Sequence, residues 1–207
     1  MTCLPFSTIS ATAVVCLIAG PALAECPTGP DDLTNGVQVE HDDDSVTIYR
    51  RLPDGRIEEV VNYQDGSGEE TVVISHHGLW VVSNHLRQDG KDQMDTLDRT
   101  DIEDADALPV PKQDLRWSGM TTFTQAGEPP TQQELTVVVG RERNVRYGDC
   151  TLTAWPVVIR YLNETIDMTE AVDYLPDLGF GVLTGIKDDI GTDAYVPISI
   201  AVVPTAE

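Results

Sequence analysis

Basic residues are scarce in this sequence. Its 207 residues include 13 Lys and Arg, three of them Lys, against 35 Asp and Glu, and the formal net charge is -22. Nucleic-acid phosphates and anionic lipid head groups both select surfaces rich in Lys and Arg. The imbalance therefore argues against a nucleic-acid-binding protein and against docking on an anionic membrane surface.

The sequence also lacks the short motifs that mark the commoner catalytic sites. It has no Gly-x-Ser-x-Gly nucleophile turn, no His-Glu-x-x-His zinc motif and no Cys-x-x-Cys redox pair. A glycine-rich phosphate loop between a strand and a helix is missing as well. We therefore expect no cofactor, and a non-catalytic protein more readily than an enzyme.

Charged side chains are absent from residues 1–24. This segment contains an apolar run over residues 11–20 and ends in Pro21-Ala-Leu-Ala24, whose small residues at positions 22 and 24 match a signal-peptidase site. The run is shorter than the roughly 20 residues that a transmembrane helix needs. We predict a signal peptide over 1–24, no permanent membrane anchor, and a periplasmic or secreted protein. A buried N-terminal helix is the alternative.

Cysteine is rare once the signal peptide is removed, because only Cys26 and Cys150 remain. Two cysteines in an oxidising compartment most simply form one disulfide. Two free thiols or a redox pair are the alternatives, although redox cysteines usually lie close together in the sequence. We expect a structural bridge between Cys26 and Cys150.

Long helical apolar stripes are missing, and short alternating runs take their place. Turns such as Pro53-Asp-Gly55 separate runs rich in β-branched residues, which predicts five antiparallel strands between residues 37 and 85. Apolar residues alternate again in four later runs, which are 135–139, 155–161, 180–186 and 196–202. We predict one mainly β domain over 25–207, an antiparallel meander that forms a curved sheet, a partly open barrel or a sandwich.

An acidic segment separates the two halves, over about 88–113. Aspartate recurs there at every third position from Asp89 to Asp104, and apolar residues are few. This composition predicts an exposed loop or short helix. Carboxylate oxygens are the ligands of calcium, so Asp92, Asp95, Asp98 and Asp101 are candidate calcium ligands, with a solvated acidic surface as the alternative. A calcium-dependent surface or adhesion module is accordingly one hypothesis for the function.

The surplus of acids leaves a second functional hypothesis open. A secreted hydrolase could use a pair of carboxylates that are close in space but not in sequence. Trp80, Trp117 and Trp155 could then form a platform for a sugar, or they could simply fill the core. His76 and His77 precede Gly78, and we expect them at the tip of a hairpin without a ligand.

The C-terminal third carries a resemblance. The segments Tyr147-Gly-Asp-Cys150 and Tyr174-Leu-Pro-Asp-Leu-Gly-Phe-Gly-Val-Leu183 resemble the last strands of small uncharacterised exported β-rich proteins of proteobacteria. Their layout is distantly similar to that of periplasmic half-barrel proteins such as the lipoprotein carriers. The resemblance implies a curved sheet and an envelope location, and it transfers no catalytic residue. Together, the β pattern, the export signal and the missing catalytic motifs favour a non-catalytic envelope protein that binds an apolar or extended ligand. The expected partner is a hydrophobic small molecule, a lipid or another envelope protein.

Overall fold

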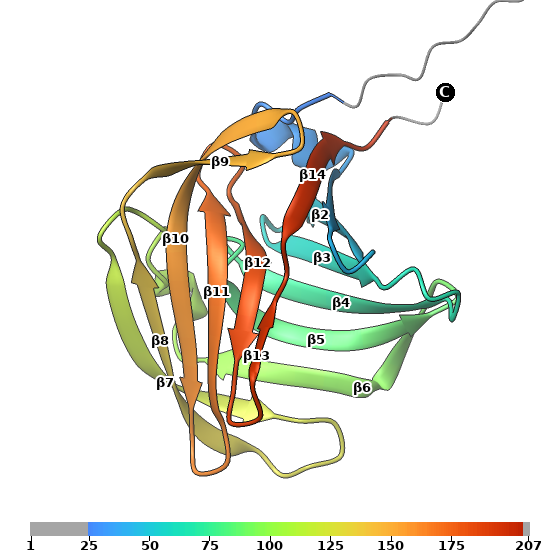
Figure 1. The fold of residues 1–207 in the computed structure, drawn as a ribbon. Helices are drawn as coiled ribbons and strands as arrows, with labels where there is room; N and C mark the ends of the chain where they lie inside the picture. The colour runs from blue at the N-terminus through green and yellow to red at the C-terminus, as the bar shows by residue number, and fades with distance from the viewer. Residues whose placement is uncertain (1–24, 205–207) are drawn as a thin grey trace, which may run out of the picture.

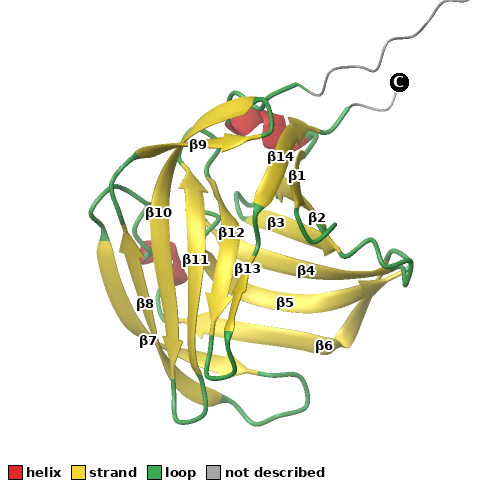
Figure 2. Ribbon diagram, viewed as in Figure 1, coloured by secondary structure: helices red, strands yellow, loops and turns green. Residues whose placement is uncertain are grey.

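The computed structural model describes residues 25–204, so the predicted signal peptide lies outside the described residues. In chain order the strands are β1 (Val37–His41), β2 (Val46–Arg51), β3 (Ile57–Asn62), β4 (Glu69–His76), β5 (Trp80–Gln88), β6 (Lys91–Ile102), β7 (Arg116–Thr124), β8 (Thr131–Val139), β9 (Arg143–Tyr147), β10 (Cys150–Leu162), β11 (Asp167–Leu175), β12 (Phe180–Lys187), β13 (Thr192–Ala194) and β14 (Pro197–Val202). Two short 3-10 helices, η1 (Pro30–Thr34) and η2 (Ala105–Ala107), complete the described elements (Figure 2). No helix among these residues is long and apolar enough to cross a membrane.

All fourteen strands belong to one antiparallel sheet, in which most strands pair with their neighbours in the chain. The order is β13-β12-β11-β10-β8-β7-β6-β5-β4-β3-β2-β1-β14, with β9 paired to β10 beside this path. The prediction of a mainly β antiparallel meander is therefore confirmed, as are the five strands between residues 37 and 85. The two ends of the path, β13 and β14, are not hydrogen-bonded to each other, so the sheet is not closed into a barrel.

The sheet folds over on itself. In Figure 1, β3–β6 cross behind β10–β13, and β7 and β8 form the bend between these halves. The two halves touch directly, because the rings of Tyr49 on β2 and Phe180 on β12 stack with centroids 4.2 Å apart. The N–H of Gly181 also donates a 3.0 Å hydrogen bond to the carbonyl of Gly78, in the turn between β4 and β5. The alternating strands thus bury one face each in a shared interior.

The interior contains two groups of buried apolar side chains. One group lies near the disulfide and includes Leu33 of η1, which is fully buried. The other lies around Trp80 and the inward-facing residues of β8 and β10. The chain segment that joins β13 to β14 passes between the halves, since the Tyr195 N–H bonds to Thr184 of β12 and the Val196 carbonyl accepts from Asp42 after β1.

The acidic segment differs from the prediction. Residues Lys91–Ile102 form the twelve-residue strand β6, so the expected loop or short helix is wrong for this part of the segment. The rest of the segment contains the short helix η2 and an irregular connector. Backbone hydrogen bonds to β5 and β7 hold β6 in the sheet, and they do not require apolar side chains. Most of its side chains remain in contact with water, and only Thr100 is buried.

Candidate functional site

The four aspartates that we considered as calcium ligands do not gather around one point. On the regular part of β6, Asp98 pairs with Asn84 of β5 and Asp101 pairs with Thr122 of β7. Successive side chains of a strand point to opposite faces, so residues three apart such as Asp98 and Asp101 face away from each other. Within residues 25–204, no three His, Cys, Asp or Glu side chains are grouped so that they could hold a metal ion.

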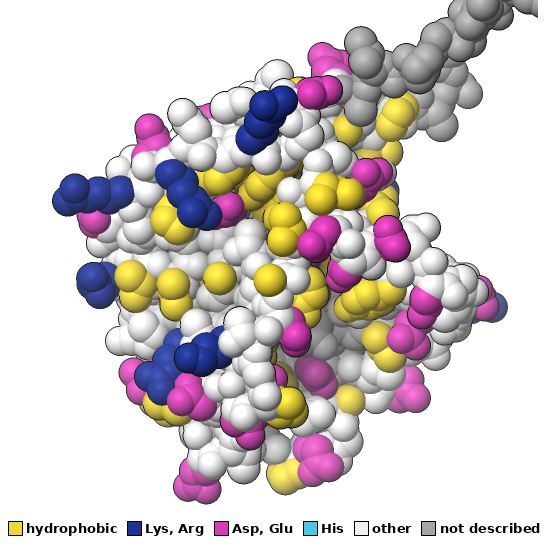
Figure 3. Space-filling view, in the orientation of Figure 1, with side chains coloured by type: hydrophobic (Ala, Val, Ile, Leu, Met, Phe, Trp, Pro, Cys, Tyr) yellow, Lys and Arg dark blue, Asp and Glu magenta, His cyan; other side chains and the backbone are white. Residues whose placement is uncertain are grey.

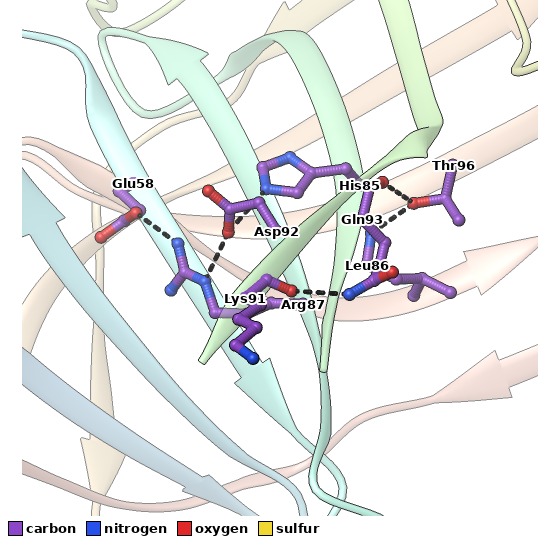
Figure 4. Close-up of polar contacts among 8 residues, drawn as sticks. All are labelled: Glu58, His85, Leu86, Arg87, Lys91, Asp92, Gln93 and Thr96. Carbon is purple, nitrogen blue, oxygen red and sulfur yellow. Dashed lines mark hydrogen bonds and ion pairs between the residues drawn. The ribbon is translucent and has the colours of Figure 1, made fainter. Parts of the chain in front are cut away.

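Asp92 instead belongs to a polar network shown in Figure 4. Its Oδ1 accepts a 2.7 Å hydrogen bond from Nε of Arg87 and lies 3.2 Å from Nε2 of His85. The Arg87 guanidinium, with a smaller contribution from His85, lowers the pKa of Asp92. Arg87 also reaches Glu58 at 3.4 Å, so the network joins β3, β5 and β6. These contacts give the network a structural role.

The disulfide between Cys26 and Cys150 is present, with Cα atoms 5.6 Å apart. It fixes the segment that precedes η1 to the start of β10. The three tryptophans pack in or against the core: Trp80 is fully buried and meets Trp117 edge-on at 6.3 Å, and the ring of Trp155 stacks on Tyr174. They form no exposed platform for a sugar. His76 ends β4 and His77 lies in the turn that follows, as we expected.

The strongest candidate site lies inside the folded sheet, where two cavities meet at Glu59 and Leu183. The first, which we call the glutamate cavity, has a volume of about 110 Å³. Its lining comes from both halves: Glu59, Val73, Ser75, Gly78, Leu79, Val81, Ile159, Glu170, Val172, Gly181 and Leu183. The second, which we call the histidine cavity, has a volume of about 120 Å³. It is lined by His41, Ser45, Thr47, Tyr49, Glu59, Val61, Tyr63, Leu183, Ile186 and Tyr195.

Glu59 and Glu170 occupy positions where the strand pattern calls for apolar side chains. On β3, Glu59 falls between Ile57 and Val61 on the inward face, and it pairs with Tyr49 of β2 and Val73 of β4. On β11, Glu170 pairs with Ile159 of β10 and Ile186 of β12. Sequence analysis did not identify this pair. The signal that could have done so is a glutamate at an inward position of an otherwise apolar alternation.

Each glutamate has a tyrosine partner. The hydroxyl of Tyr161 donates a 3.1 Å hydrogen bond to Oε2 of Glu170. Tyr49 lies opposite Glu59 in the pairing of β2 with β3, and it favours the ionised form of Glu59. Burial raises the pKa of Glu59 to about 8, assisted by the charge of Glu170 and opposed by Tyr49. Burial also raises the pKa of Glu170 to about 7, against the effect of Tyr161. Each of the two carboxyl groups therefore gains or loses its proton close to neutral pH.

His41 is the second unusual polar group. The residue lines the histidine cavity and is only 5% exposed, yet no group in the described part of the chain makes a well-formed hydrogen bond to either ring nitrogen. The backbone of Leu183 and of Ser45 lies close enough only to oppose in part the lowering of its pKa. Burial lowers the pKa of His41, with the charge of Asp43 as the largest opposing effect. Unpaired buried polar atoms are costly and call for an explanation, of which an unseen ligand or water is a common one.

The linked cavities thus combine two carboxyl groups, an unpaired imidazole and several hydroxyl groups with apolar walls. Such an arrangement can bind a small molecule through directed hydrogen bonds, or it can move protons. No family model, curated protein or solved structure matches this chain.

Proposed function

We propose that this protein is an exported, non-catalytic binding protein that holds a small polar ligand in the linked cavities inside its curved sheet. The observation that carries the proposal is the pair Glu59 and Glu170, which line one cavity from opposite halves of the sheet. Both glutamates are half-buried, and withdrawing two acids from water costs folding free energy unless they are paired. Such a departure from the apolar pattern is typical of a functional site.

The size and chemistry of the cavities narrow the ligand class. An apolar cavity of about 150 Å³ accommodates a benzene-sized molecule. The two cavities, at about 110 and 120 Å³, therefore suit a ligand smaller than a lipid acyl chain. An acyl chain would also leave both glutamates and His41 without polar partners. The proposal keeps the binding role that the sequence indicated and replaces an apolar or extended ligand with a small polar one.

A carboxylate-dependent hydrolase is the second candidate, and the raised pKa values of Glu59 and Glu170 favour it. General acids in hydrolases have such values because they must hold a proton near neutral pH. The small volume of the glutamate cavity counts against it, since a glycosidase must hold a sugar ring on each side of the bond that it cleaves.

Ligand-induced stabilisation tests the proposal. The exported chain is screened by thermal unfolding against small amines, polyols, carboxylic acids and sugars, and each hit is checked by calorimetry. We expect hits that stabilise the wild type and the Glu58→Gln variant but not the Glu59→Gln variant. Glu58 is the matched control because it lies next to Glu59 on the other face of β3, toward Arg87. Chromogenic glycosides and esters test the alternative, and turnover lost in both Glu59→Gln and Glu170→Gln would replace binding with hydrolysis.

A further inference from the structure

The two interior glutamates have no positively charged partner to stabilise their ionised forms. Within residues 25–204, every ion pair involves other carboxylates, and no Lys, Arg or His pairs with Glu59 or Glu170. The effects that act on the pKa of Glu59 and Glu170 likewise include burial, a second acid and tyrosine hydroxyls, but no cation. The partner that would neutralise two such acids is a positive charge.

The tyrosines leave room for that partner. A carboxylate has two oxygens that can accept about four hydrogen bonds. Tyr161 uses Oε2 of Glu170, which leaves the other oxygen free. The ring of Tyr49 stacks on Phe180, and Tyr49 lies beside Glu59 in the lining of the histidine cavity. Two carboxyl groups held in this way can accept the three N–H donors of one ammonium group.

His41 provides an independent indication of a ligand, and of a ligand with two ends. It lies in the histidine cavity, which also contains Glu59, so one molecule could reach both groups. Its ring nitrogens are buried and unpaired, and the lowered pKa keeps the imidazole neutral near pH 7. A neutral imidazole can donate one hydrogen bond and accept another. It therefore suits a hydroxyl or a second amine at the far end of the ligand.

We propose, building on the binding function above, that the ligand is a small organic amine whose ammonium group lies between Glu59 and Glu170 and whose second polar end reaches His41. Short diamines and amino alcohols have this chemistry. Val61, Leu183 and Ile186 line the cavity walls between the polar groups and would cover the carbon chain of such a molecule. Cationic ligands also suit an exported protein whose net charge of -22 attracts cations from solution.

Calorimetric titration with matched probes tests this assignment. The probes are diaminobutane, aminoethanol and their uncharged analogue butanediol, with succinate as the anion of similar length, all at physiological salt so that attraction to the acidic surface is screened. We expect one equivalent of an amine to bind, with butanediol and succinate much weaker. Glu59→Gln and Glu170→Gln should each weaken amine binding by about tenfold or more, because each removes a charge-assisted hydrogen bond.

Two further measurements distinguish amine binding inside the cavity from amine binding to the acidic surface. Glu58→Gln should leave the affinity for amines unchanged. His41→Ala should weaken the binding of diaminobutane and aminoethanol, which have two polar ends, and should leave the binding of methylamine unaffected. Titrations in buffers of different ionisation enthalpy should show proton release near neutral pH, because the amine binds the ionised glutamates. Amine binding that survives Glu59→Gln would overturn the assignment. If only neutral molecules bind, and bind through Glu59, the assignment fails while the binding function stands. If no probe or screened compound binds, both fail.

Discussion

Glu59 on β3 and Glu170 on β11 line the same interior cavity from opposite halves of the folded sheet. The charge of Glu170 contributes to the raised pKa of Glu59, so each acid makes ionisation of the other less favourable. The cavity walls around them are largely apolar, with Ile159, Val172 and Leu183 among them. From this relationship we predict a dependence of stability on pH that is separate from the effect of the many surface carboxylates.

We expect the free energy of unfolding to fall as the pH rises from about 5 to about 8. The ordinary pKa of both side chains is 4.5, and in the folded protein it is raised to about 8 for Glu59 and about 7 for Glu170. Between these values the folded state keeps a proton that the unfolded state has lost. Stability is therefore fully present below about pH 4.5 and decreases by up to about 1.4 kcal/mol per pH unit for each group. Denaturant titrations at a series of pH values measure this slope.

The Glu59→Gln/Glu170→Gln double variant serves as the control for that slope. Glutamine has a similar shape and no ionisable group, so the variant should lose most of the decline and be more stable than the wild type at pH 8. General repulsion among the surface acids acts on both proteins alike and remains in both curves. Parallel curves for the two proteins would show that the interior glutamates ionise normally.

Most of the fold could be predicted because the strand pattern is local. Val37, Val39 and His41 of β1 alternate with half-exposed residues, and all three are buried on one face as the alternation implies. The turns also act locally, since Gly55 adopts a φ of +86° in the predicted Pro53-Asp-Gly55 turn. The disulfide could be predicted because only two of the four cysteines lie outside the predicted signal peptide.

Strand β6 and the interior site could not be predicted for a different reason. The membership of β6 in the sheet depends on hydrogen bonds to β5 and β7, which no pattern within residues 91–102 reveals. The meeting of Glu59 with Glu170 depends on how the sheet folds over, and that is a property of the whole chain. Local alternation assigns each side chain to a face, but it does not say which faces meet.

The disulfide should account for a large part of the stability. Cys26 and Cys150 are 124 positions apart in the sequence, and the loss of chain entropy in the unfolded state corresponds to about 4–5 kcal/mol for a loop of this length. The Cys26→Ser/Cys150→Ser variant should unfold at correspondingly lower denaturant concentration. Wild-type protein unfolded under reducing conditions should match it. A change well below this size in both would mean that the reduced chain stays compact when unfolded.

A buried ionic contact should fix the β9–β10 hairpin to the sheet. Asp173 of β11 is 3% exposed, and it receives hydrogen bonds from Arg143 and from the hydroxyl of Tyr147, both on β9. Asp173→Ala should lower the free energy of unfolding by about 3 kcal/mol, since it removes the partner of Arg143 and leaves the buried hydroxyl of Tyr147 without an acceptor. Tyr147→Phe should cost about 1–2 kcal/mol.

The ion pair between Arg160 and Asp167 provides the matched control for Asp173. Its two hydrogen bonds are 2.8 and 2.9 Å long, but both side chains are about half exposed. Exposed pairs contribute little because water solvates the separated charges. Asp167→Asn should therefore leave the unfolding midpoint nearly unchanged, and an effect equal to that of Asp173→Ala would show that burial is not what makes the Asp173 contact important.

Calcium should have no specific effect on stability. Asp98 and Asp101 face opposite sides of β6, and Asp92 is engaged by Arg87 and His85. We expect calcium and magnesium to shift the melting temperature equally, through general screening of an acidic surface that is evident in Figure 3. A chelator should change nothing. Stabilisation by calcium alone would revive the calcium-dependent module as a hypothesis.

Substitution of Gly78 tests whether the contact between the two halves of the sheet maintains the shape of the cavity. Its φ of +67° is unfavourable for other residues, and a Cβ at this position would lie 2.5 Å from Cα of Phe180, a backbone atom that can move only if β12 shifts with it. Gly78→Ala should therefore push β12 away from the turn and break the hydrogen bond from Gly181. We expect the free energy of unfolding to fall by several kcal/mol, or the protein to fail to fold.

Gly55→Ala is the matched control, because Gly55 has a φ of +86° and nothing lies within 4 Å of the added Cβ. It should cost about 1 kcal/mol from backbone strain alone. Equal losses in the two variants, measured by denaturant unfolding, would mean that strain and not the contact between the halves explains the effect at Gly78.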